Sequence, residues 1–201
     1  MIITPPAVEE ATGHVAEMYA VDLDEDGFVF AHTRVMAVNP EAHAAFMALI
    51  RAIVPSIGVN AYEAATLGVA REIGSGHCLL AHGRKSVRAG VVDESGLASF
   101  AGGDDSAFSD SEQAIINYSR RLSSDPASMT DADTQSLRDA GFSDRQIVDI
   151  TLAAAARNYF SRALLALAVP LDDMPGLDPA VSEALRRAAD KDPAVGSTAV
   201  L

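Results

Sequence analysis

Residues 60–88 read NAYEAATLGVAREIGSGHCLLAHGRKSVR, and this stretch decides the fold. Apolar residues recur at helical spacing up to Ile73, and the Gly-Ser-Gly run at 74–76 then interrupts the pattern. A new helix is expected over 76–88, with Ser75 as its N-cap. Such a break can fold the second helix back so that the two helices face each other.

The sequence on both sides of this stretch also follows helical rather than alternating spacing, which predicts an all-α fold. One helix is expected over 40–54, where a proline follows, and the longest over 143–169, where another proline ends it. The acidic run at 21–27 and the Gly-, Ser- and Asp-rich run at 94–110 are expected to be loops. Further helices are expected to begin after the capping residues Ser109, Thr130 and Asp178.

The composition agrees with an all-α fold in one domain. Of the 201 residues, 49% are hydrophobic and 5% aromatic, and there is no tryptophan. Alanine is abundant, so the core must consist of helices packed closely around small side chains, and an all-β sandwich is excluded. This length suits a single domain over 1–201 with a flexible C-terminal tail at about 190–201.

The charge and the single cysteine exclude several classes of function. With 15 basic against 28 acidic residues the formal net charge is -13, so neither nucleic acid nor a membrane is an expected partner. We expect no signal peptide or membrane span, because charged residues interrupt the longest apolar run at 147–170. Cys78 alone cannot form an intrachain disulfide or a multi-cysteine metal site, and it suits a reducing cytoplasm.

Reactive side chains gather around this cysteine. Cys78 falls in the first turn of its helix, where free backbone N–H groups and the helix dipole favour an anion such as a thiolate. His82 follows at i+4 on the same face, so its imidazole can accept the thiol proton. Glu63 on the preceding helix could face His82 across the break. The three residues would then form a Cys-His-Glu relay in which the carboxylate orients the imidazole.

Each of these residues also has a purely structural interpretation. Glu63 fits the third position of a capping box opened by Asn60, where a helix is expected to begin, and Ser75 could act only as an N-cap. Cys78 could be a small buried apolar residue, and His77 a polar residue of the first turn. A metal site built from His77, His82 and Glu63 is not expected, because the two histidines are five residues apart on a helix and point in different directions.

The spacing of these residues resembles the active-site motif of the alkylhydroperoxidase D and carboxymuconolactone decarboxylase family. Eleven residues separate Glu63 from Ser75, two separate Ser75 from Cys78, and three separate Cys78 from His82. His77 directly precedes the cysteine, as in the family. The helices around the motif follow a similar order, and the resemblance covers a core of about 28–172.

The resemblance implies an alkylhydroperoxidase D-like helical bundle that assembles into trimers or hexamers, and it implies no cofactor and no metal. It also implies that Cys78 attacks a hydroperoxide, that His82 and Glu63 relay its proton, and that His77 tunes the site. Ser75 stands where the family has its resolving cysteine. A serine cannot form the disulfide that closes the dithiol cycle, so an external thiol would have to reduce oxidised Cys78.

Three functions remain as alternatives at this point. The first is a peroxidase that reduces small organic hydroperoxides through one cysteine, with weak or lost turnover because of Ser75. The second is a cofactor-independent decarboxylase or lactone enzyme that acts on a small acid, in which Glu63 and His82 transfer protons and Cys78 is incidental. The third is a non-catalytic, oligomeric protein that responds to redox conditions.

Overall fold

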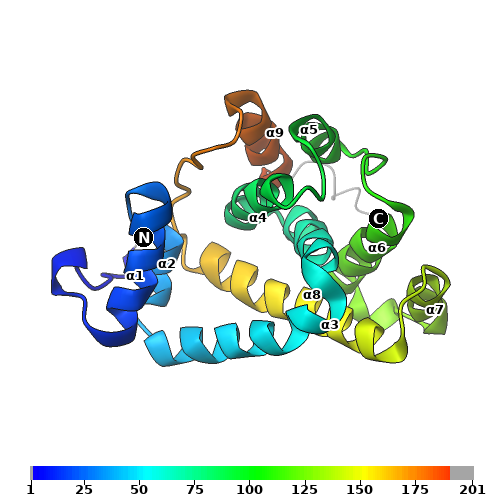
Figure 1. Cartoon of the computed structure of the whole chain (residues 1–201), viewed down its shortest axis with the longest axis horizontal. Helices are drawn as coiled ribbons and strands as arrows, with labels where there is room; N and C mark the ends of the chain where they lie inside the picture. The colour runs from blue at the N-terminus through cyan, green and yellow to red at the C-terminus, as the bar shows by residue number, and fades with distance from the viewer. Residues whose placement is uncertain (1, 191–201) are drawn as a thin grey trace, which may run out of the picture.

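The computed structural model describes residues 2–190, which form helices and, within that range, no β-strand (Figure 1). The predicted all-α class is therefore confirmed, and the predicted tail at about 190–201 lies almost wholly outside the described residues. The α-helices are α1 (Gly13–Asp26), α2 (Ala31–Met36), α3 (Pro40–Ile73), α4 (Gly76–Arg88), α5 (Glu94–Gly102), α6 (Asp110–Ser124), α7 (Asp131–Asp139), α8 (Asp144–Ala166) and α9 (Pro179–Ala189), with short 3-10 turns η1 (Val8–Glu10) and η2 (Pro126–Ser128).

Helix α3 is the centre of the fold, and a break at Gly58 divides it into two parts. The predicted end before Pro55 is wrong: the helix continues through that proline and breaks at Gly58, whose φ of 81° and ψ of 166° suit glycine almost alone. The part after the break is almost entirely buried from Ala61 to Ala70 and packs against α4, α6 and α8. This buried part is the one that carries Glu63.

Helices α4 and α8 pack on either side of the pocket described below. Helix α4 has the predicted bounds, 76–88. Helix α8 begins with the predicted capping box of Ser143 and Gln146 and ends at Ala166, three residues earlier than predicted. It runs alongside α3, which brings the C-terminal half of the chain next to the motif on α4 (Figure 1).

Of the two predicted loops, the one at 21–27 is helical up to residue 26, and the one at 94–110 is helical up to residue 102, whereas 103–109 are non-helical as predicted. Residues 21–26 belong to α1, because Arg84 on α4 forms a buried ion pair with Asp26 that holds the acidic turn against the core. Residues 94–102 form α5, which Asp93 caps by accepting a hydrogen bond from the Gly96 amide. In both segments tertiary contacts supply the stabilisation that a short polar helix lacks by itself.

Apolar side chains also remain on the surface of the long helices. Helix α3 is the one helix in residues 2–190 whose length and mean hydropathy would suit a membrane span, and 22% of its apolar window is buried. Helix α8 exposes Val148, Leu152 and Tyr159. The single chain therefore leaves apolar surface on α3 and α8 uncovered.

Candidate active site

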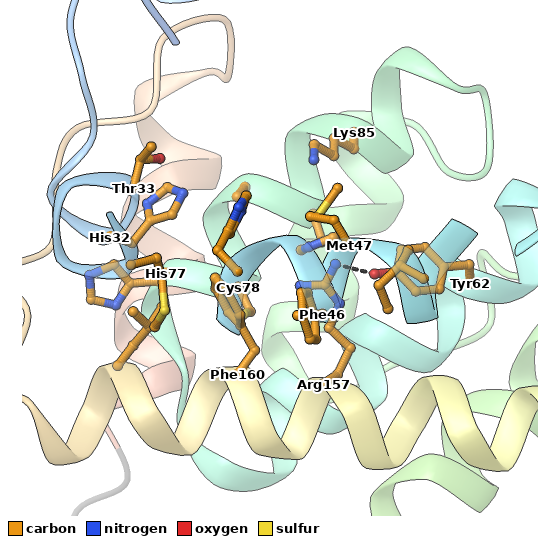
Figure 2. A pocket seen from close by; sticks show the side chains of 16 residues that line it. His32, Thr33, Phe46, Met47, Tyr62, His77, Cys78, Lys85, Arg157 and Phe160 are labelled. Carbon is orange, nitrogen blue, oxygen red and sulfur yellow. Dashed lines mark hydrogen bonds between the residues drawn. The ribbon is translucent and has the colours of Figure 1, made fainter. Parts of the chain in front are cut away.

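A cavity of about 250 Å³ lies between α2, α3, α4 and α8 (Figure 2). Cys78, His77 and His82 line it from α4, and Tyr62 lines it from α3. The remaining lining residues are His32, Thr33, Met36, His43, Phe46, Met47, Ile50, Ala81, Lys85, Arg157, Phe160 and Leu164. The cavity therefore brings the predicted thiol and the predicted base to one largely apolar space.

Glu63 and His82 form a buried pair, as the sequence predicts. His82 donates its Nδ1 hydrogen to Glu63 Oε2 over 2.6 Å, and both residues are 4% exposed. The capping-box interpretation of Glu63 is wrong, because Asn60 lies inside α3 and its side chain instead donates to Glu112. A carboxylate that accepts the Nδ1 hydrogen leaves Nε2 of the neutral imidazole free to accept a proton.

Burial sets the charge states of this pair. It lowers the pKa of His82 to about 4, although the adjacent Glu63 carboxylate raises that pKa. Burial also raises the pKa of Glu63, but attraction to the His82 imidazole and the hydrogen bond from it outweigh burial, so the net shift is downward. Near neutral pH the pair therefore holds a neutral imidazole and an ionised carboxylate, which is the charge state of a general base with its orienting group.

The thiol of Cys78 contacts a hydroxyl that the sequence analysis did not single out. Cys78 is 3% exposed, and its Sγ lies 3.0 Å from Oγ of Ser161 on α8, within hydrogen-bond distance. In the described part of the chain the thiol makes no hydrogen bond to His82. Both side chains line the same cavity, so a bound reactant could stand between them.

Ser75 occupies the predicted N-cap position without the capping hydrogen bond, and His77 bonds to the backbone. Ser75 is at the N-cap of α4, but its side chain makes no capping hydrogen bond and its buried hydroxyl has no partner within residues 2–190. The prediction that it acts only as an N-cap is therefore wrong for the side chain. His77 donates its Nε2 hydrogen to the Pro170 carbonyl over 3.0 Å, and burial lowers its pKa.

Helix α8 also contributes Arg157, which lines the pocket. Arg157 donates to the Tyr62 hydroxyl, and its guanidinium lies over three aromatic rings of the pocket. The only signal in the sequence is that Arg157 and Ser161 are polar and four residues apart, and so lie on one face of the helix. Across residues 2–190, no three His, Cys, Asp or Glu side chains lie together in a way that could hold a metal ion.

Fold and site together define a class: an all-α protein in which a cysteine and a histidine line one pocket and a buried carboxylate binds the histidine. No family model matches the sequence, and the comparison with curated proteins finds no match. The comparison with solved structures finds proteins of the same fold at low sequence identity.

The alkylhydroperoxidase AhpD core of a peroxidase-related protein from Ralstonia eutropha is similar with a TM-score of 0.70 and 19% identity, over 85% of this chain and 92% of that one. A peroxidase-related protein from Silicibacter sp. gives 0.68 and 20%, over 87% and 95%. A cysteine-to-alanine variant of the debrominase Bmp8 in complex with 2,3,4-tribromopyrrole gives 0.70 and 17%, over 94% and 97%. These likenesses show that the chain has the alkylhydroperoxidase D fold.

Proposed function

We propose that this protein is a peroxidase-related enzyme that reduces small organic hydroperoxides through Cys78. The observation that carries the proposal is that Cys78 and His82 line one cavity, and that the buried Glu63 carboxylate binds His82. A thiol acts as a nucleophile only after losing its proton, and a neutral histidine held by a carboxylate is the usual group that takes it. Two of the proteins with the same fold are described as peroxidase-related, which supports a peroxidase activity.

In the first step the Cys78 sulfur attacks the terminal oxygen of the hydroperoxide. A sulfur–oxygen bond forms and the oxygen–oxygen bond breaks. His82 takes the proton of the thiol and passes it to the leaving alkoxide, which departs as the alcohol. The Cys78 thiol is thereby oxidised by two electrons to a sulfenic acid. The Ser161 hydroxyl, 3.0 Å from the sulfur, is placed to donate a hydrogen bond to the thiolate before attack.

The second step needs a reductant from outside the chain. Ser75 cannot supply a thiol, so an external thiol condenses with the sulfenic acid, releasing water and leaving a mixed disulfide. A second external thiol then displaces Cys78 and takes the disulfide away. A reducing compartment such as the cytoplasm would hold such thiols.

The test is to mix the full-length protein with one equivalent of cumene hydroperoxide and follow intact mass with a sulfenate-trapping reagent. We expect one trapped oxygen at Cys78, release of the matching alcohol, and neither event in Cys78→Ala. A Cys78 that stays reduced while the folded protein is exposed to excess hydroperoxide would overturn the proposal.

The decarboxylase alternative is supported by the Glu63–His82 pair alone, which could transfer protons without the thiol. It predicts conversion of a small lactone or β-keto acid that survives in Cys78→Ala and is lost in His82→Ala. A non-catalytic protein would do neither, but it would keep its assembly. Conversion by Cys78→Ala would thus replace the peroxidase proposal with the decarboxylase one.

We also propose that the partner of this chain is another copy of itself, in a trimer or hexamer. The apolar side chains that remain exposed on α3 and α8 support an interface there, since large exposed apolar patches mark contact surfaces. Light scattering should give a mass three or six times the 21.0 kDa of the chain. A monomer at micromolar concentration, or recovery of the intact protein with membranes, would contradict this proposal.

A further inference from the structure

Arg157 is a buried cation without an acidic partner in the described part of the chain. It is 8% exposed and forms no ion pair there, and its hydrogen bond goes to the neutral hydroxyl of Tyr62. Its Nε atom is buried and has no hydrogen-bond partner. Burying a charge costs free energy unless the charge is paired. An anion bound to the guanidinium would therefore offset the cost of burying Arg157.

The other charges of the pocket do not satisfy it. Glu63 is within electrostatic range of Arg157, but its Oε2 is bound by His82 at 2.6 Å. Burial lowers the pKa of His32 to about 3 and that of His82 to about 4, so both rings are neutral near pH 7. Lys85 stands across the pocket from Arg157 and forms no ion pair among the described residues (Figure 2). The cavity thus has two cations without an acidic partner among the described residues, Arg157 and Lys85, in a chain whose net charge is -13.

The shape of the cavity limits what could supply the anion. A cavity of about 150 Å³ holds benzene, so the 250 Å³ here leaves room for one ring and a small acid group. Apolar walls such as Phe46 and Phe160 suit the ring, and the fork of the guanidinium suits a carboxylate, which it can bind through two hydrogen bonds.

We propose that this pocket binds a small aromatic or branched organic acid with its carboxylate on Arg157, so that the preferred hydroperoxide carries an acid group. This inference rests on the proposed function for the reaction, and it adds the substrate class. Arg157 is then the residue that binds the carboxylate and determines specificity. Lys85, at the exposed rim of the cavity, attracts the carboxylate over a longer distance.

A structural role for Arg157 makes a different prediction. The guanidinium lies 5.0 Å from the ring centre of Tyr62, 5.5 Å from Phe46 and 5.7 Å from Phe160, and cation–π attraction to these rings could alone explain its burial. In that case the charge of a ligand would not matter. The two roles are therefore separated by a comparison of an acid with its neutral isostere.

The experiment measures binding of benzoate and of benzamide by titration calorimetry to the full-length Cys78→Ala protein, which removes thiol chemistry. We expect benzoate to bind at least about tenfold more tightly than benzamide, and Arg157→Met to remove that preference to within about twofold. Arg157→Lys should keep part of the preference, because it retains the charge but loses the fork. Lys85→Met is the matched control on the exposed rim and should weaken benzoate binding by less than about threefold.

Several results would overturn the inference. These are equal affinity for the two probes, no detectable benzoate binding at about 10 mM, or a benzoate preference that survives in Arg157→Met. If Arg157→Met fails to fold, the comparison of the two probes on the unsubstituted pocket still decides. Binding is measured without Cys78, so a Cys78 that does not react with hydroperoxide would not affect the binding result. A Cys78 that reacts, in a protein with no preference for benzoate, would overturn only the proposed substrate class.

Discussion

The two walls of the pocket contrast in how their residues are brought together. On α4, Cys78 and His82 are four residues apart in one helix, and the partner of His82 comes from the adjoining helix α3. On α8, Ser161 reaches Cys78 from 83 residues away in the chain. Local helix geometry therefore places Cys78 and His82 together, whereas the packing of α4 on α3 brings Glu63 to His82 and the packing of α8 on α3 sets the second wall.

The two walls also differ in their proposed chemical roles. The α4 wall holds the groups that would be oxidised and would move the proton, while the α8 wall adds a hydroxyl on the sulfur and a positive charge. If this division is correct, substitutions on α4 should change the rate of oxidation most. Substitutions on α8 should change it less and should change the choice of reactant more.

The largest effect is expected from the base on the α4 wall. His82→Ala, and Glu63→Gln to a lesser degree, should slow the oxidation of Cys78 by hydroperoxide by about 100-fold or more, because general-base assistance is lost. Stopped-flow measurement of thiol loss against hydroperoxide concentration gives the rate constant. A rate within about threefold of the parent protein would remove both residues from the relay.

Ser75→Cys should convert a reaction that stops after one oxidation into one that turns over. The new thiol would stand one helical turn from Cys78, near enough for a disulfide if the first turn of α4 loosens. After hydroperoxide we expect a mass loss of two hydrogens and then repeated turnover with a dithiol reductant. A variant that gains an oxygen without forming the disulfide would show that the geometry forbids resolution.

Removing the hydroxyl on the α8 wall should have a smaller effect. Ser161→Ala is expected to slow oxidation of Cys78 by about tenfold, as for the loss of one hydrogen bond to a charged group. Ser86→Ala is a suitable control, because it removes another fully buried hydroxyl, one that has no partner among the described residues. Equal rates in the two variants would mean that Ser161 only fills space beside the thiol.

The smallest expected effect is on stability: the free energy of unfolding should depend on pH because of His82 in the pocket. The pKa of His82 is about 4 in the folded protein against 6.5 for an unperturbed histidine, so the unfolded chain binds a proton first as the pH falls. Stability should therefore be full above pH 6.5 and decline toward pH 4, by up to about 1.4 kcal/mol per pH unit for this residue. Urea unfolding at fixed protein concentration should show a shallower decline in His82→Asn, and identical slopes would contradict the burial of a neutral ring.

Local interactions explain how much of the fold could be predicted from the sequence. The capping boxes at Ser109 and Ser143 form as predicted, because each is a set of hydrogen bonds within four residues. The break in α3 was misplaced at Pro55 because a proline weakens a helix, whereas the backbone of Gly58 actually leaves helical geometry. Helix α5 was missed because its stability comes from burying Leu97 and Phe100 in the core rather than from its own sequence.

By itself the sequence determined an all-α chain and the one-face placement of Cys78 and His82, since helical spacing fixes neighbours within a turn or so. Only the tertiary structure decided that Glu63 turns to His82, that Ser161 meets the thiol, and that Arg157 is buried without an acid partner among the described residues. Such contacts depend on the angle and register at which separate helices pack. Those are set by the close packing of the whole core, and no short stretch of sequence encodes them.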